Sequence, residues 1–147
     1  MIYTVGEMAK LLGVAPSTLR YYDREGLLPF VERSESGIRV FTDENIRWLR
    51  LIECLKQAGM TLRDIRTYIE MSMEGDDTIE ARLDMFVKQR ERLVQQIAQL
   101  QQTLEMVEYK CWYYETAKAA GSTEIPKNMS ESDIPEAHIA ARRRLRK

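Results

Sequence analysis

Cysteine, histidine and proline are scarce in this chain of 147 residues, which contains two, one and four of them respectively. The cysteines, Cys54 and Cys111, stand far apart and match neither a disulfide framework nor the spacing of metal ligands. We therefore expect both thiols to be reduced, and we expect no metal and no other cofactor. The sequence also lacks a glycine-rich phosphate loop and paired carboxylates in an apolar setting, so it offers no catalytic residues and does not predict an enzyme.

An excess of charge of one sign is also missing, because the net charge is −1. Residues 1–66 contain ten Lys or Arg and nine Asp or Glu, so DNA binding would depend on where the basic side chains lie. No apolar run approaches the ~18 residues of a membrane span. Glu7 and Lys10 interrupt the segment in which a signal peptide would need its apolar core. We therefore expect a cytoplasmic protein with no membrane partner.

A capping box predicts a first short helix close to the N-terminus. Thr4 is the expected N-cap, Glu7 stands at the third helical position, and Gly13 follows the last apolar residue as the end of the helix. A second short helix is expected after a turn over residues 13–16. Such a pair is typical of a helix-turn-helix, whose second helix enters the major groove of DNA.

The second helix carries side chains that suit DNA recognition. We expect Ser17 to cap this helix, which then runs through Leu19 to about Glu25 and ends at Gly26. Two amphipathic helices of an ordinary core would have the same spacing, so the interpretation depends on the residue types. Arginine pairs with guanine edges or phosphates, and tyrosine and serine hydroxyls bind phosphate oxygens. The residues of this kind on one face are Ser17, Thr18, Arg20, Tyr21 and Arg24.

Residues 4–29, T-V-G-E-M-A-K-L-L-G-V-A-P-S-T-L-R-Y-Y-D-R-E-G-L-L-P, strongly resemble the start of the MerR (mercury-resistance regulator) family of bacterial transcription factors. The resemblance continues through residues 37–41 and 58–65 and covers roughly residues 1–120. It implies a mainly α fold, with a winged helix-turn-helix DNA-binding domain followed by a long dimerisation helix that forms an antiparallel coiled coil. The expected domains are residues 1–75 for DNA binding, 78–119 for the coiled coil and 120–147 for a C-terminal tail.

A hairpin is predicted beside the recognition helix, with strands over Val31–Ser34 and Ile38–Phe41 and a turn over residues 35–37. Arg33 and Arg39 lie where such a wing would touch a phosphate backbone. The alternative is that both are solvated arginines of an ordinary hairpin. The resemblance implies a DNA contact for Arg39 in particular.

Two further helices are expected between the hairpin and the long helix. One is capped by residues 42–45 and ends at residues 58–59, and the next is capped by Thr61 and ends at Gly75. The resemblance implies that this pair forms a second wing, in which Thr61 faces the DNA backbone. Free amide groups at a helix N-terminus suit a phosphate.

A heptad pattern predicts one long helix from Thr78 to about Ala119. Its apolar residues recur in steps of three and four over more than four heptads, which is typical of a coiled-coil seam. No second helix of matching length is present to cover this stripe, so we expect a homodimer. The resemblance implies antiparallel pairing, with the two recognition helices on successive major grooves of a palindromic site. The expected seam consists of Ile79, Leu83, Phe86, Leu93, Ile97, Leu100, Leu104 and Val107.

The composition changes after Gly121. Pro126, Pro135 and many polar residues predict a loop or a loosely docked tail. The five positive charges within residues 142–147 either touch DNA or are solvated and disordered, and we expect the second. His138 has no partner in the sequence.

Regulators of this family usually respond to an inducer, and three classes are considered. A soft metal needs two or more close thiolates, and Cys111 stands alone at the end of the long helix. A large hydrophobic drug needs an enclosing domain, and the residues after Gly121 are too few to form one. Trp112, Tyr113, Tyr114 and Met106 are enough only for a small groove, and we expect them instead to pack a helix end against the partner's DNA-binding domain.

The third class is covalent chemistry at Cys54, on the helix between the two wings. Short members of the family that respond to aldehydes and related electrophiles carry a cysteine at this place, so the resemblance supports Cys54 as the sensor. The chemistry would be attack of a thiolate on an electrophilic carbon. The alternative, that Cys54 is a small buried apolar residue, stays open.

The sequence therefore predicts a homodimeric DNA-binding protein, and the resemblance implies that it is a transcription regulator that binds a palindromic promoter site. The resemblance implies that it distorts the spacer of double-stranded promoter DNA so that RNA polymerase engages both promoter elements, in response to electrophile or aldehyde stress. The alternatives are a regulator that responds to a small hydrophobic ligand and an architectural DNA-binding protein without an inducer. The expected DNA contacts are Thr4, Ser17, Thr18, Arg20, Tyr21, Tyr22, Arg39 and Thr61.

Overall fold

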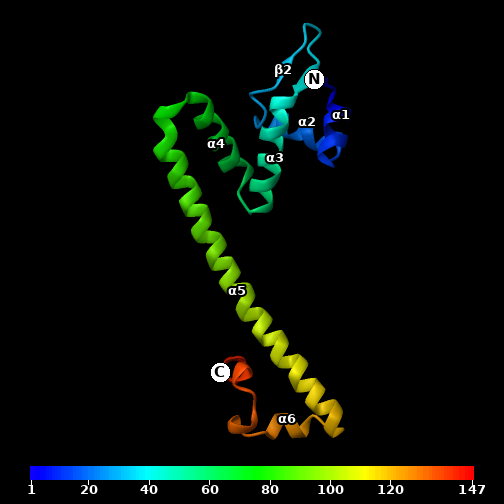
Figure 1. Ribbon diagram of the computed structural model, residues 1–147, viewed down its shortest axis with the longest axis vertical. Helices are drawn as coiled ribbons and strands as arrows, with labels where there is room; N and C mark the ends of the chain where they lie inside the picture. The colour runs from blue at the N-terminus through cyan, green and yellow to red at the C-terminus, as the bar shows by residue number, and fades with distance from the viewer. The chain divides into compact units, whose positions relative to one another are not determined.

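The computed structural model describes residues 1–147, which form two compact units, Met1–Arg90 and Glu91–Lys147. The long helix α5 (Ile79–Ala120) begins in the first unit and continues into the second (Figure 1). Its bounds agree within one residue with the helix predicted from the heptads. No helix of the chain is both long enough and apolar enough to cross a membrane.

The first unit opens with the predicted pair of short helices. In α1 (Val5–Leu12) the capping box is confirmed, because the amide of Glu7 donates to Thr4 Oγ1 at 3.3 Å and the amide of Thr4 donates to Glu7 Oε2 at 2.8 Å. The helix ends at Gly13, whose φ of 70° lies in the left-handed region that glycine adopts without strain.

Helix α2 spans Pro16–Arg24 and therefore begins earlier than predicted. Ser17 is not its cap: the N-cap is Ala15, which makes no side-chain cap bond. The prediction was wrong because Pro16 occupies the first helical position, where its fixed φ suits the helix and its missing amide needs no partner. Gly26 follows the helix with a φ of 75°, and a Cβ there would stand 3.3 Å from the Cδ of Arg66.

Three short strands form a sheet in the order β1-β3-β2. The predicted hairpin is present. Its first strand, β2 (Glu32–Arg33), is shorter than predicted, and its second, β3 (Arg39–Thr42), has the predicted length but is shifted by one residue. The sequence did not predict β1 (Ile2–Tyr3), which pairs antiparallel with the far end of β3.

Two helices complete the elements before α5. Helix α3 (Asp43–Gln57) starts at a capping box in which the amide of Thr42 donates to the side chain of Asn45 at 2.8 Å. Helix α4 (Leu62–Glu74) is capped by Thr61 Oγ1 and ends at Gly75, and the short 3-10 turn η1 (Asp76–Thr78) leads into α5. All of these caps agree with the predictions.

The core of the first unit lies among α1, α2, β3, α3 and α4. Phe86 of α5 packs against this core, and its ring meets Tyr68 edge-on with the centroids 5.0 Å apart. It was predicted as a seam residue, but in this chain it is half-buried against the first unit. The largest fully buried side chains of this core are Met8, Leu19, Tyr22, Leu27, Phe41, Leu49, Ile52, Ile65 and Ile69.

In the second unit the chain after α5 is folded, and the prediction of a loose or disordered tail was wrong. It forms α6 (Glu124–Asn128), the 3-10 turn η2 (Glu131–Asp133) and α7 (Glu136–Leu145). The prolines begin helices here, because Pro126 lies in the first turn of α6 and Pro135 is the N-cap of α7.

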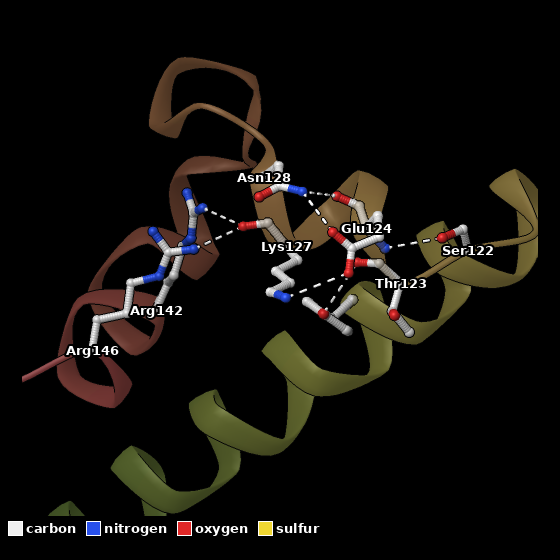
Figure 2. Close-up of polar contacts among 8 residues, drawn as sticks. Ser122, Thr123, Glu124, Lys127, Asn128, Arg142 and Arg146 are labelled. Atoms are coloured by element: carbon white, nitrogen blue, oxygen red, sulfur yellow. Dashed lines mark hydrogen bonds and ion pairs between the residues drawn. The ribbon is translucent and has the colours of Figure 1, made fainter.

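Arginines join these short elements to one another. Figure 2 shows Arg142 and Arg146 converging on the carbonyl of Lys127, at 3.4 and 2.9 Å. Arg142, which is 6% exposed, also donates to the carbonyl of Met129 at 2.7 Å. Arg143 pairs with Glu131 of η2. These basic residues therefore hold the C-terminal segment together.

The C-terminal segment also packs on α5. Arg144 donates to Glu105 of α5 at 2.6 Å. The ring of His138 lies 5.6 Å from that of Trp112 and 6.1 Å from that of Tyr109, between centroids. Tyr109 is 4% exposed as a result of this packing. His138, for which the sequence indicated no partner, therefore belongs to an aromatic cluster.

Candidate nucleic-acid interface

Helix α2 presents a basic, hydroxyl-bearing surface. Ser17, Arg20, Tyr21 and Arg24 are exposed, and the guanidinium of Arg24 lies 5.9 Å from the ring centroid of Tyr21. A hollow of about 340 Å³ is lined by Ser17, Arg20, Arg24 and, from β3, Arg39. The structure thus brings three arginines and a serine hydroxyl to one concave surface, which suits a phosphate group.

Arg39 reaches this hollow while bound to α2. Its Nη2 donates to Oδ2 of Asp23, and the two side chains are 23% and 19% exposed. Arg33 of β2 donates to the same carboxylate oxygen at 3.2 Å. The hydrogen bond from Arg39 holds the pKa of Asp23 below its usual range, so this carboxylate stays charged. Neither wing arginine is therefore simply solvated.

Tyr22 does not share the exposed face of α2, so the structure contradicts the predicted groove contact of this residue. The residue is 1% exposed because it points from α2 into the core. Its hydroxyl donates to Glu53 Oε1 at 2.5 Å and accepts from Lys56 Nζ at 3.0 Å, both on α3. Burial, followed by the bond to Glu53, raises the pKa of Tyr22. Its role is to attach α2 to α3.

Thr4, Thr18 and Thr61 were also predicted to touch DNA. The hydroxyls of Thr4 and Thr61 act as N-caps, Thr61 by accepting from the amide of Asp64 at 3.1 Å. Both threonines remain exposed, whereas Thr18 is half-buried on α2. Thr61 also places the N-terminus of α4 at the surface, where Arg63 and Arg66 line a hollow of about 430 Å³.

The two cysteines have exposed side chains in the single chain. For Cys54 this is not the buried apolar environment that was the alternative to a sensor role. Its neighbours on α3 include Glu53 and Lys56, the two residues that bind Tyr22. No group of three or more His, Cys, Asp or Glu side chains is placed to hold a metal ion.

Most of the predicted seam on α5 is uncovered in the single chain. Its exposed members span 51% to 68% exposure, and Leu93 is half-buried. Isolated exposed apolar residues need no explanation, but residues 97–107 carry four of them in steps of three and four, which form one apolar stripe along the helix. The exposed members are Ile79, Leu83, Ile97, Leu100, Leu104 and Val107.

Sequence reasoning did not assign a role to Asp23, because a carboxylate repels the phosphates of DNA. A signal was nevertheless present, because the hairpin prediction placed Arg33 and Arg39 on neighbouring strands. In the structure they stand directly opposite each other. Like charges at such positions are unfavourable without a counter-charge, and Asp23 supplies it.

Two family models match the chain. The model described as MerR HTH family regulatory protein matches residues 3–72, and the one described as MerR, DNA binding matches residues 46–108. Together they cover the helix-turn-helix, the wing, α3, α4 and most of α5.

Curated relatives and a solved structure agree with these matches. An uncharacterized HTH-type transcriptional regulator of Haemophilus influenzae is 46% identical over 92% of this chain and 98% of its own length. The HTH-type transcriptional regulator AdhR of Bacillus subtilis is 40% identical over 62% of this chain and 65% of its own length.

The solved structure is that of HiNmlR, described as a MerR family regulator lacking the sensor domain, bound to promoter DNA. It is 48% identical, with a TM-score of 0.73, and the match covers 84% of this chain and 98% of that one. The chain therefore belongs to the MerR family of helix-turn-helix proteins and is a DNA-binding transcription regulator, not an enzyme.

Proposed function

We propose that the protein acts as a homodimer on a palindromic promoter site. The observation that carries this proposal is the uncovered apolar stripe of α5, represented by Ile97 and Leu100 at 56% and 68% exposure. A second copy of the chain supplies a stripe of equal length and the same pattern, as an antiparallel coiled coil requires. Two-fold symmetry of the dimer then matches two-fold symmetry of the site.

In this dimer each α2 enters a major groove. Arg20 and Tyr21 face the base edges and nearby phosphates, while Ser17 and Thr18 bind the backbone at the start of the helix. Arg39 on the first wing and the α4 N-terminus at Thr61 hold the backbone on either side, and Thr4 lies at the start of α1. The hollow shared by α2 and β3 supports this assignment, and the solved relative is described as bound to promoter DNA.

Activation is proposed to act through the shape of the DNA. Bending and untwisting a promoter spacer costs several kcal/mol, so the protein needs strong anchors on both half-sites. Arginine contacts to phosphate, repeated by symmetry, are of the kind that offset such a cost. The distorted spacer then lets RNA polymerase engage both promoter elements.

The inducer is proposed to be an aldehyde or a related electrophile that reacts at Cys54. Three features support this: the thiol is exposed, it lies on α3 between the two wings, and the adjacent Glu53 binds Tyr22 of α2. An adduct at Cys54 therefore forms on the helix that holds the recognition helix. The solved relative is described as lacking the sensor domain, and the match covers 98% of that chain.

The experiment is run-off transcription from the protein's own promoter region, with and without a reactive aldehyde. Wild type is compared with Cys54→Ser, and Cys111→Ser is the matched control because it removes the other exposed thiol. We expect the aldehyde to activate transcription with wild type and Cys111→Ser but not with Cys54→Ser. An equal response of both variants, or none from any protein, would exclude Cys54 as the sensor.

A response to a small hydrophobic ligand is the second candidate, and one feature favours it. A hollow of about 340 Å³ lies between α5 and α7 and has Met106, Ala141 and Leu145 in its wall. Its size is at the lower end of the range for ligand pockets. Activation by an apolar ligand that is lost in Met106→Glu and kept in Cys54→Ser would favour this candidate over the electrophile.

A further inference from the structure

We infer that Asp23 is a positioning residue of the DNA interface, which holds the first wing against the recognition helix and keeps Arg39 directed at a backbone phosphate. This inference rests on the proposed function, because it concerns how the same surface binds DNA. Asp23 touches no DNA in this arrangement. It acts through the two wing arginines.

The hairpin has an electrostatic problem of its own. Arg33 of β2 and Arg39 of β3 are partners in the antiparallel register, so two guanidinium groups stand opposite each other. Directly opposed like charges destabilise a strand pair. With strands of two and four residues, the wing has few backbone bonds to offset this repulsion.

Asp23 supplies the missing negative charge from outside the hairpin. A single oxygen, Oδ2, accepts from Nη2 of Arg39 and, at 3.2 Å, from Nη2 of Arg33. Arg33 also donates through Nη1 to the carbonyl of Gly37 at 3.1 Å, which ties the hairpin turn into the same group. Both strands of the wing are therefore fastened to the last turn of α2.

The attachment leaves Arg39 able to bind DNA. An arginine has five N–H donors in a planar fork, and one nitrogen of Arg39 is committed to Asp23. The same side chain lines the hollow with Ser17, Arg20 and Arg24. A phosphate in this hollow would accept from Arg39 while Asp23 holds the other side of the guanidinium.

The direction in which Asp23→Asn changes the affinity for DNA distinguishes a positioning role from simple repulsion between Asp23 and phosphate. A carboxylate near DNA repels phosphate, so removing it without any other consequence would strengthen binding by about twofold at ~10 Å in water. If Asp23 positions the wing, Asp23→Asn instead weakens binding, because Arg39 is no longer held at the hollow. The loss of one charge-assisted bond lowers the affinity about tenfold or more, so the loss at both half-sites lowers it about 100-fold or more.

The test measures affinity for the duplex that wild-type protein selects from a random-sequence pool, at several salt concentrations. We expect Asp23→Asn to bind about 100-fold more weakly, because the dimer loses about tenfold at each of its two half-sites. Its plot of log affinity against log salt should be shallower by about two, because Arg39 no longer neutralises a phosphate at either half-site. Asp23→Asn should add no further loss in an Arg39→Gln background. Glu35→Gln is the control, because it removes an exposed acid from the same hairpin, and we expect unchanged or slightly tighter binding.

Each outcome decides the matter. If Asp23→Asn binds DNA as tightly as Glu35→Gln does, the positioning role is overturned. The same holds if the loss of affinity caused by Asp23→Asn adds in full to the loss caused by Arg39→Gln. If Asp23→Asn unfolds at the assay temperature, Arg39→Lys replaces it, since a lysine keeps the charge but loses the planar fork. Undiminished affinity of Arg39→Lys would then overturn the inference. Failure of wild type to select any palindrome refutes the proposed function itself and is recognised before a variant is compared.

Discussion

Truncating Leu100 to alanine should weaken the proposed dimer by a calculable amount. Leu100 is 68% exposed in the single chain, at the middle of the uncovered stripe of α5. Burying a whole leucine side chain contributes ~1.5–3 kcal/mol, so burying the exposed part contributes ~1–2 kcal/mol. The dimer contains this residue twice, which doubles the loss to ~2–4 kcal/mol and raises the dimer dissociation constant about 30-fold to 1000-fold.

Sedimentation equilibrium over a range of protein concentrations measures that constant, and Val94→Ala is the matched control. Val94 is 60% exposed on the same helix but stands about 120° around the helix axis from Leu100, outside the stripe. We expect Val94→Ala to leave the dissociation constant unchanged. Equal weakening by both variants, or an undisturbed dimer with Leu100→Ala, would show that the stripe is not the dimer interface.

Three further substitutions test contacts within the chain. Tyr22→Phe deletes the hydroxyl that binds Glu53, and thermal unfolding should show a loss of about 1 kcal/mol, with weaker DNA binding and unchanged dimerisation. Because Asp23 has a lowered pKa when folded, its ion pairs stabilise the protein fully above about pH 4 and lose this effect as the pH falls through the lowered value. The difference in unfolding free energy between wild type and Asp23→Asn should therefore shrink below pH ~4 in acid titrations. A difference that stays constant would contradict the assignment of the lowered pKa of Asp23 to its bond with Arg39. Arg142→Ala removes the buried guanidinium that binds two carbonyls, so limited proteolysis should cut residues 121–147 much faster while DNA affinity stays the same.

The features predicted correctly are those set by residues close together in the chain. The capping box of Thr4 and Glu7 and the cap at Thr61 involve partners three positions apart, so they can be recognised in the sequence alone. The long helix repeats one pattern over many turns, and its bounds followed from that repetition. Local and repeated signals of this kind do not depend on how distant parts of the chain meet.

The features that were missed depend on distant contacts. Strand β1 exists because Ile2 finds a partner at Thr42, and two residues carry no recognisable strand pattern. The tail was predicted as loose because its prolines and charges resemble a linker, whereas Arg142 is buried between α6 and α7 and binds carbonyls thirteen and fifteen residues away. Composition does not reveal that a charged side chain has acceptors in the fold.

The start of α2 shows how a small local error changes the candidate site. With Ser17 as the cap, the helix would have begun two residues later, at Thr18. With Pro16 in the first position, Ser17 lies inside the helix and lines the same hollow as Arg20 and Arg24. Residues at these spacings share one face of a helix, so the corrected start makes the basic surface continuous.

In the proposed complex, α2 has to hold its position on DNA with only nine residues, and the structure supports this helix on two sides. The exposed face carries the arginines, and the adjacent residues Tyr22 and Asp23 leave the helix about 100° apart. Tyr22 is bound by α3, and Asp23 is bound by the wing. Recognition helix and wing are thus set before DNA arrives, which lowers the ordering cost of binding.

The same arrangement gives the proposed response of Cys54 a physical route. Glu53 precedes the thiol and Lys56 follows it by two residues, and these two side chains hold the hydroxyl of Tyr22. An adduct that displaces either of them changes the support of α2 on one side, while the attachment to the wing through Asp23 remains on the other. The recognition helix would then turn relative to α3 but keep its wing, which alters the shape imposed on the DNA without releasing it. Regulation by distortion requires that combination, since a regulator that simply dissociated could not hold the spacer in either form.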